Sequence, residues 1–193
     1  MMNNRQWNIL NWNIRGINDS AKWLALRNKI TEADCDIVCI QETKRENFDG
    51  RYLLSFCPIK LNKYDYIPSI GASGGIITIW NDNLFARETL HKNEYSISIR
   101  FTSKQTGEHW ILTNIYGPCQ DDRRQEFIQW FQDIDMPIET KWMIMGDFNY
   151  IRYPQNRNIQ GGSISDMLIL MKPSTLWVWL RFHLRAELLP GVT

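Results

Sequence analysis

Four short polar clusters hold the residues of this sequence that could act on a phosphate ester. They are NWNIRG at 11–16, QETK at 41–44, NIYGP at 114–118 and GDFN at 146–149. A carboxylate can hold Mg²⁺, which proteins bind through one or two carboxylates together with water and phosphate oxygens. A second carboxylate can orient or deprotonate an attacking water molecule. Amides and a phenol can donate hydrogen bonds to a phosphate whose negative charge grows in the transition state.

Each cluster also has an ordinary structural explanation when it is taken alone. Asparagine at a strand end is most often part of a turn, a single glutamate after a strand is most often solvated, and Gly-Asp readily starts a turn. The indication of a shared site therefore comes from the four clusters together, in their order along the chain, and from no single one of them.

The clusters follow predicted β-strands, which must bring them together. Short apolar or alternating stretches predict strands at 7–13, 35–41, 75–80, 95–101, 110–116 and 141–145. Apolar residues at helical spacing predict helices at 20–33, capped by Asp19 or Ser20, and at 123–134. Many strands with few helices predict an α+β fold of packed sheets with outer helices. Ligand groups converge at strand ends in such architectures, so we expect the clusters to meet at one rim.

Size and composition exclude several classes of protein. The 193 residues predict one domain, and the net charge of +1 excludes a purely electrostatic coat on DNA. No apolar run approaches the roughly 20 residues that span a bilayer, and residues 1–7 lack the features of a secretory signal. We therefore expect an intracellular protein with no membrane partner. Cys35 and Cys39 would lie about 13 Å apart in one strand, too far for a disulfide, and we expect all four cysteines to be reduced.

The order and spacing of the motifs resemble a known family. WNIRG, DIVCIQETK, SGGIITIW, TNIYGP and GDFN follow one another as in the endonuclease/exonuclease/phosphatase superfamily. Within it, the sequence most resembles the endonuclease domain of plant LINE-type (non-LTR) retrotransposon polyproteins, from about residue 8 to about residue 170. The resemblance implies a two-sheet β-sandwich flanked by helices. It also implies an Mg²⁺-dependent hydrolase, with Mn²⁺ as the alternative ion, that nicks DNA and leaves a 3′-hydroxyl to prime reverse transcription.

The resemblance also assigns roles to individual residues. It places Glu42 as the direct Mg²⁺ ligand, with Asn13 in the same metal site. Tyr116 corresponds to the tyrosine beside the scissile phosphate, and Asp147 to the aspartate that positions the nucleophilic water. Asn149 corresponds to the phosphate-contacting partner of Asp147, and Asn114 to a residue that supports the catalytic site. DNA is the implied partner, in the nucleus if the retrotransposon role is retained, and no small-molecule cofactor is implied. The sequence does not define the oligomeric state.

The sequence departs from the family at its C-terminal end. The family closes with a Ser-Asp-His cluster, in which the aspartate orients the histidine and the histidine contacts or protonates the phosphate. Here Ser165 and Asp166 come too early and are followed by Met167, and His183 has no aspartate before it. The expected domain is therefore 7–170, incomplete at its C-terminus, followed by a non-family tail at 171–193. The implied activity is then impaired or absent.

A frame shift is one hypothesis for this tail. The family commonly continues DMLIFNEAI where this chain has DMLILMKPS at 166–174, and loss of one nucleotide near codon 170 converts one text into the other. Residues 176–193 can be encoded by nucleotides whose other frame again resembles the family. An intron boundary or a gene-model error would have the same effect, and a genuine terminal helix at 176–189 is the structural alternative. The nucleotide sequence across codons 168–172 and downstream distinguishes these explanations.

Three functions remain open at this point. The first is a retrotransposon-derived phosphodiesterase, inactive or impaired as written. The second is a non-catalytic module that still binds metal or nucleic acid, which measurable binding without turnover would reveal. The third is another phosphodiesterase of the same superfamily, such as an abasic-site repair nuclease or a phosphoinositide or sphingolipid phosphodiesterase.

Overall fold

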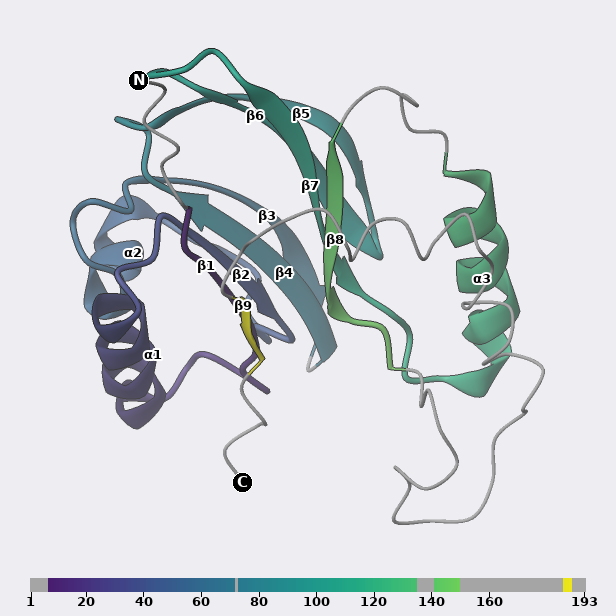
Figure 1. The fold of residues 1–193 in the computed structure, drawn as a ribbon. Helices are drawn as coiled ribbons and strands as arrows, with labels where there is room; N and C mark the ends of the chain where they lie inside the picture. The colour runs from purple at the N-terminus through teal and green to yellow at the C-terminus, as the bar shows by residue number, and fades with distance from the viewer. Residues whose placement is uncertain (1–6, 72, 135–140, 150–185, 189–193) are drawn as a thin grey trace.

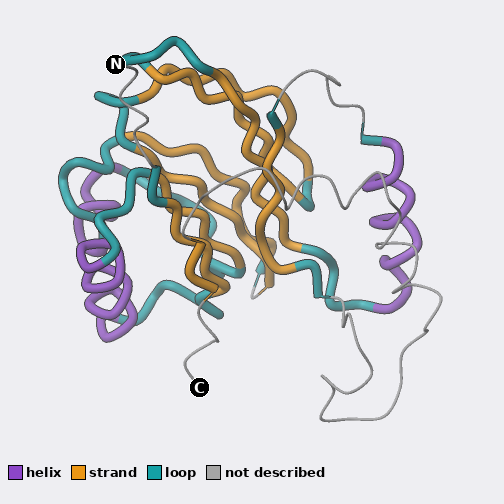
Figure 2. The backbone as a smooth tube through the Cα atoms, viewed as in Figure 1, coloured by secondary structure: helices purple, strands orange, loops and turns teal. Residues whose placement is uncertain are grey.

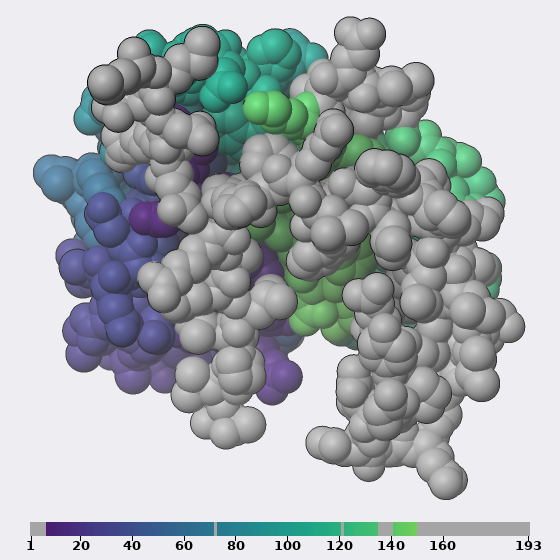
Figure 3. Space-filling model, in the orientation of Figure 1, coloured from purple at the N-terminus to yellow at the C-terminus, as the bar shows by residue number. Residues whose placement is uncertain are grey.

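The computed structural model describes residues 7–71, 73–134, 141–149 and 186–188. Their strands form two sheets that face each other, and the helices lie on the two outer sides (Figures 1 and 2). In the space-filling view, the early chain in purple and blue and the later chain in green lie on opposite sides of the molecule (Figure 3). This four-layer arrangement confirms the predicted α+β sandwich flanked by helices.

The first sheet has five strands in the order β3-β4-β2-β1-β9. Helix α1 connects β1 to β2, so these two strands run parallel, whereas β2-β4 and β3-β4 are antiparallel. The Asp19 carboxylate caps α1 by accepting a hydrogen bond from the amide of Ala21 at 2.8 Å, as predicted. The elements are β1 (Ile9–Asn13), α1 (Ser20–Glu32), β2 (Ile37–Gln41), α2 (Gly50–Phe56), β3 (Lys63–Ile70), β4 (Ser73–Trp80) and β9 (Ala186–Leu188).

The second sheet has four strands in the order β5-β6-β7-β8. Its first three strands form an antiparallel meander, and β8 joins β7 in parallel after the crossover through α3. Helix α3 covers the outer face of this sheet (Figure 1). The elements are β5 (Phe85–Asn93), β6 (Ser96–Ser103), β7 (His109–Tyr116), the 3₁₀ turn η1 (Asp121–Arg123), α3 (Arg124–Asp133) and β8 (Trp142–Asp147).

Alternation along the strands separates the apolar side chains into three layers. Successive side chains of a strand point to opposite faces, so Leu10 of β1 packs outward with Leu26 of α1, whereas Ile9 faces the second sheet. Phe101 lies in the same inter-sheet layer, and Phe127 of α3 packs on the outer face of the second sheet. Burial of each such side chain stabilises the fold by about 1.5–3 kcal/mol.

The six strands and two helices predicted from the sequence are all present, with ends that shift by at most two residues. Strands β3, β5 and β9, helix α2 and the 3₁₀ turn η1 escaped prediction. Strands β3 and β5 lie at the outer edges of their sheets. Many side chains of β3 are half-buried, and β5 carries several exposed polar side chains, so neither has the apolar alternation of a central strand. Helix α2 has only seven residues.

Part of the predicted tail can be compared with the structure. Ala186–Leu188 form β9, which pairs in parallel with β1. The alternative of a helix at 176–189 is therefore wrong at these three residues, because the outer edge of β1 offers backbone hydrogen bonds that a strand can complete. The rest of the tail, with Ser165, Asp166 and His183, lies outside the described residues.

Two smaller expectations can also be compared with the structure. All four cysteines are free, in agreement with the expected reduced thiols. Within the described part of the chain, no helix has the length and apolar character needed to cross a membrane.

The close approach of β7 and β8 gives a test of this fold. Gly146 has φ +143°, and a Cβ atom there would lie 1.9 Å from the carbonyl oxygen of Ile115. We expect Gly146→Ala to lower the free energy of unfolding by about 2–4 kcal/mol. The matched control is Gly50→Ala at the start of α2, where a Cβ atom meets nothing within 4 Å and the change should be neutral or slightly stabilising. Urea unfolding of both variants measures this, and equal effects would contradict the described packing.

Candidate active site

The polar site residues lie where the inter-sheet layer ends. On β2 the inward positions run Ile37, Cys39 and Gln41, and on β8 they run Met143, Met145 and Asp147. Each series changes from apolar to polar toward the C-terminal end of its strand. Because β1 is parallel to β2 and β7 is parallel to β8, the polar ends of each pair lie together. Hydrogen bonds between the sheets place both pairs at one rim.

A buried amide network joins the two sheets just below this rim. The side-chain nitrogen of Gln41 donates to the Oδ1 atoms of Asn11 at 2.8 Å and Asn114 at 2.6 Å. Asn114 in turn donates to the carbonyl oxygen of Ile77 and to the hydroxyl of Thr78, both at 3.1 Å. Gln41 and Asn114 are fully buried. Such a network rigidifies its surroundings because any partner left alone would be a desolvated polar group.

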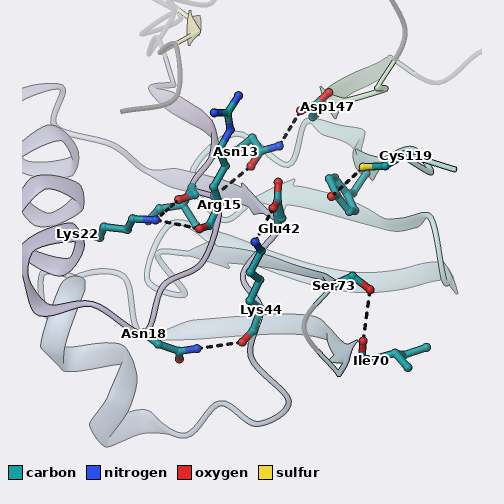
Figure 4. Close-up of polar contacts among 12 residues, drawn as sticks. Asn13, Arg15, Asn18, Lys22, Glu42, Lys44, Ile70, Ser73, Cys119 and Asp147 are labelled. Atoms are coloured by element: carbon teal, nitrogen blue, oxygen red, sulfur yellow. Dashed lines mark hydrogen bonds and ion pairs between the residues drawn. The ribbon is translucent and has the colours of Figure 1, made fainter. Parts of the chain in front are cut away.

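Asp147 is the centre of a second bridge between the sheets. Its Oδ2 atom accepts a hydrogen bond from the side-chain amide of Asn13 at 2.6 Å, and Figure 4 shows the two side chains pointing toward each other. Its Oδ1 atom accepts from the backbone amide of Asn149 at 2.9 Å. The Asn149 side chain donates to the carbonyl oxygen of Gly117 at 2.6 Å. The Asp147 carboxylate is therefore fixed from both sides, one oxygen by each partner.

Tyr116 lies beside Asp147, since the two residues are register partners in β7 and β8. Its phenol oxygen is 3.4 Å from the sulfur of Cys119. Burial raises the pKa of Tyr116 above its ordinary value; the neighbouring Cys119 and the charge of Glu42 act in the same direction, and Asn149 opposes the shift. The phenol therefore keeps its proton at neutral and mildly alkaline pH and remains a hydrogen-bond donor.

Glu42 directly follows β2 and faces the same rim. Its carboxylate forms a 3.0 Å ion pair with the ammonium group of Lys44 and has 18% of its side-chain surface exposed. Figure 4 shows the carboxylate pointing toward the side on which Asn13 and Asp147 lie. The position of the Lys44 ammonium group shows that the carboxylate oxygens of Glu42 can hold a cation at this place. Glu42 therefore suits Mg²⁺, which needs few protein carboxylates, although no group of three His, Cys, Asp or Glu side chains in the described residues could enclose a metal.

The backbone is strained at several site positions. Five described non-glycine residues have positive φ, and four of them belong to the predicted polar clusters. Glu42 has φ +54° and Asn149 has φ +54°. This conformation costs about 1–3 kcal/mol at each non-glycine residue and persists where surrounding contacts enforce it. Here it turns Glu42 out of the β2 direction and lets the amide of Asn149 reach Asp147. The other two cluster residues with positive φ are Arg15 and Lys44.

The structure brings most of the predicted site residues together and separates one by depth. Asn13, Tyr116, Asp147 and Asn149 are connected by hydrogen bonds or strand register. Asn114 lies one layer deeper, fully buried, where it supports the rim and is not exposed to a ligand.

Two further residues were in the motifs but had no predicted role. Gln41 organises the amide network and Lys44 pairs with Glu42. The sequence signal for Gln41 was a polar residue at an inward position of an otherwise apolar strand. Nothing in the sequence indicated the ion pair of Lys44.

Most of this chain matches one known protein family. Residues 10–183 match the Endonuclease/Exonuclease/phosphatase family. The chain belongs to this family. Members of the family generally depend on a divalent metal ion. A comparison with curated proteins finds no match.

Solved structures of low sequence identity share the fold of this family member. The AP endonuclease LMAP from Leishmania major has a TM-score of 0.60 and 14% identity, over 90% of this chain and 67% of that chain. The endonuclease domain of TRAS1, a telomere-specific non-LTR retrotransposon, has a TM-score of 0.54 and 10% identity, over 75% of this chain and 61% of that chain. The human Nocturnin catalytic domain has a TM-score of 0.51 and 16% identity, over 75% of this chain, which spans 64% of that domain. These likenesses concern the fold.

The amide network makes a testable contribution to stability. Gln41→Ala leaves the acceptors of Asn11 and Asn114 without their donor and opens a cavity, so we expect a loss of about 2–4 kcal/mol in the free energy of unfolding. Gln129→Ala is the matched control, because Gln129 is exposed and bonds only Asp133 on its own helix; we expect a change within about 0.5 kcal/mol. Urea unfolding monitored by circular dichroism compares them. A Gln41 variant as stable as the control would mean that the network does not hold the sheets together.

Proposed function

We propose that this family member hydrolyses phosphodiester bonds of DNA with the help of Mg²⁺ held at Glu42. One observation carries the proposal. The hydrogen bond between Asn13 and Asp147 brings the ends of both sheets to one rim, where a carboxylate, a neutral phenol and an amide side chain lie beside a second carboxylate. These are the groups that phosphodiester hydrolysis requires: a water-orienting base, donors for the phosphate oxygens and a ligand for a cation.

Each residue has a role that follows from its contacts. Asp147 would accept a hydrogen bond from the attacking water and hold it, since both of its oxygens are already oriented by Asn13 and Asn149. Tyr116, whose pKa is raised by burial, would donate its phenolic proton in a hydrogen bond to a phosphate oxygen. Glu42 and the Oδ1 atom of Asn13 would hold the cation. A bound Mg²⁺ supplies charge neutralisation of the phosphate oxygens.

The same geometry supports a slow rate. The described histidines lie away from the rim: His91 stacks on Trp130, with ring centroids 6.3 Å apart, and His109 begins β7 at the end opposite Tyr116. No histidine of the described residues can therefore protonate a leaving group at Asp147. Absence of a positioned acid costs about 10²–10⁴ in rate. We propose activity that is measurable only as slow nicking.

The substrate assignment rests on the resemblance to the endonuclease domain of plant LINE-type retrotransposons. The similarity in fold to the TRAS1 domain is compatible with it. On this proposal the chain derives from a retrotransposon, acts on duplex DNA, and works in the nucleus if that role is retained.

A non-catalytic binding module is the second candidate. The carboxylate of Glu42 already forms an ion pair with Lys44, and the carboxylate of Asp147 already accepts a hydrogen bond from Asn13. If both carboxylates keep these partners when DNA binds, neither can hold a metal ion or a water molecule, and the rim binds nucleic acid without cleaving it.

Nicking of supercoiled plasmid tests the proposal. With Mg²⁺ we expect slow conversion to the open circle, and we expect Glu42→Ala and Asp147→Ala each to abolish it. Glu88→Ala is the control, because Glu88 is an exposed carboxylate of β5 that pairs with Arg100 away from the rim, and it should nick as the wild type does. EDTA should stop the reaction.

The other outcomes decide between the candidates. Nicking that survives both Glu42→Ala and Asp147→Ala would refute this assignment of the site. No nicking above the Asp147→Ala baseline, together with retained binding of the plasmid, would establish the non-catalytic module instead.

A further inference from the structure

An open pocket of about 300 Å³ lies next to the candidate active site and is not explained by it. The pocket is built on the segment that follows Glu42, and the first strand hairpin closes one side of it. Its wall contains two cations, one carboxylate and three neutral polar residues. These are Lys44, Arg45, Glu46, Asn18, Asn47 and Ser69.

Arg45 is held in this pocket entirely by uncharged groups. Its Nε atom donates to the carbonyl oxygen of Asn47 at 2.7 Å, and its Nη1 atom donates to the Oδ1 atom of Asn18 at 3.2 Å. Its guanidinium lies 3.4 Å from the centre of the Tyr52 ring. An arginine has five N–H donors, so donors remain after these contacts. The group is therefore positioned in advance, and among the described residues no carboxylate pairs with it.

The remaining charges of the pocket do not neutralise Arg45. Lys44 directs its ammonium group to Glu42, at 3.0 Å (Figure 4). Glu46 is exposed and forms no ion pair with Arg45. Ser69 is 95% buried, and its hydroxyl has no hydrogen-bond partner within the described structure. A fixed, unpaired guanidinium beside amide and hydroxyl groups is complementary to a phosphate, which accepts several charge-assisted hydrogen bonds at once.

The pocket lies at the same rim as the active site. Lys44 belongs to both, because its ammonium group contacts Glu42 while its carbonyl oxygen accepts from Asn18 at 3.0 Å. Ser69 is on β3, two strands away from β2 in the sheet, which corresponds to about 10 Å at a strand spacing of ~4.8 Å. The pocket and the active site are therefore close enough to contact the same nucleic acid strand.

We propose that this pocket binds a backbone phosphate of the DNA strand, close to the phosphate held at Glu42 and Asp147, with Arg45 as its main contact. This inference rests on the proposed action on DNA. It adds a positioning site that fixes the strand before any reaction, and such contacts set the register of a protein on a duplex without reading its sequence.

Binding of a fluorescent DNA duplex in EDTA tests the pocket without any turnover. We expect Arg45→Gln to weaken binding about 5–10-fold and to reduce the slope of log affinity against log salt by about 1. Asn18→Asp keeps the acceptor for Arg45 but places a carboxylate against it, so it should weaken binding similarly. It also removes the hydrogen bond from Asn18 to the carbonyl oxygen of Lys44, so urea unfolding must show that the variant is folded under the binding conditions. Arg100→Gln is the control: it removes the same charge on β6, where Arg100 pairs with Glu88, and should change the affinity less than twofold.

Competition by inorganic phosphate identifies the ligand. Phosphate should displace the duplex more weakly from Arg45→Gln than from the wild type. If Arg45→Gln and Asn18→Asp lose phosphate binding but keep the duplex affinity of Arg100→Gln, the pocket takes a small anion and the assignment to a DNA strand is overturned. If both variants bind duplex and phosphate as the wild type does, the pocket is not an anion site. Plasmid nicking that depends on Glu42 and Asp147 is a separate readout, so either proposal can fail while the other stands.

Discussion

The side-chain amide of Gln41 joins the two sheets at the depth where their apolar layer gives way to a polar one. A sandwich needs an apolar interior, and a site needs polar groups, so the two requirements must be separated along the strands. Gln41 marks the boundary by binding Asn11 on its own sheet and Asn114 on the other. Below it the layer contains residues such as Trp80 and Phe101, and above it lie Asp147 and Tyr116. The burial of this network is what gives the rim a fixed geometry.

The charges at the rim are arranged by the same strand ends. Asp147 is oriented from both sheets and Glu42 is held at a positive φ that directs it out of its strand. Basic side chains lie next to these carboxylates: Arg15 and Lys44 appear near Glu42 in Figure 4, whereas Lys22 lies farther out and binds the carbonyl oxygens of Ile14 and Arg15. A chain with a net charge of only +1 therefore concentrates cations where a polyanion would approach. Local concentration of charge directs encounter more strongly than net charge does.

Much of the fold and of the candidate site could be predicted from the sequence. The central strands were identified because their apolar residues alternate or run together, as in Ile37–Gln41, and the polar residues that follow them were identified because strand ends collect ligands. The edge strands β3 and β5 could not be identified in this way. They are held by backbone hydrogen bonds to their partner strands β4 and β6, and the local sequence pattern does not indicate such bonds. Asn114 was placed in the site by its motif, yet its depth depends on the packing of the opposite sheet. The pairing of Lys44 with Glu42 depends on the positive φ angles of both residues, which their residue types do not predict.

Paramagnetic broadening by Mn²⁺ tests most directly whether this rim is a metal site positioned by both sheets. In a ¹⁵N-labelled sample, low concentrations of Mn²⁺ should broaden the amide signals of residues 13–16, 42–44, 116–117 and 147–149, which come from four strands. Signals at the opposite end of the sandwich, at 104–109, should remain sharp, and Glu42→Ala should restore the broadened signals. Broadening that is confined to one sheet, or that persists in Glu42→Ala, would contradict a metal site held at Glu42 between the two sheets.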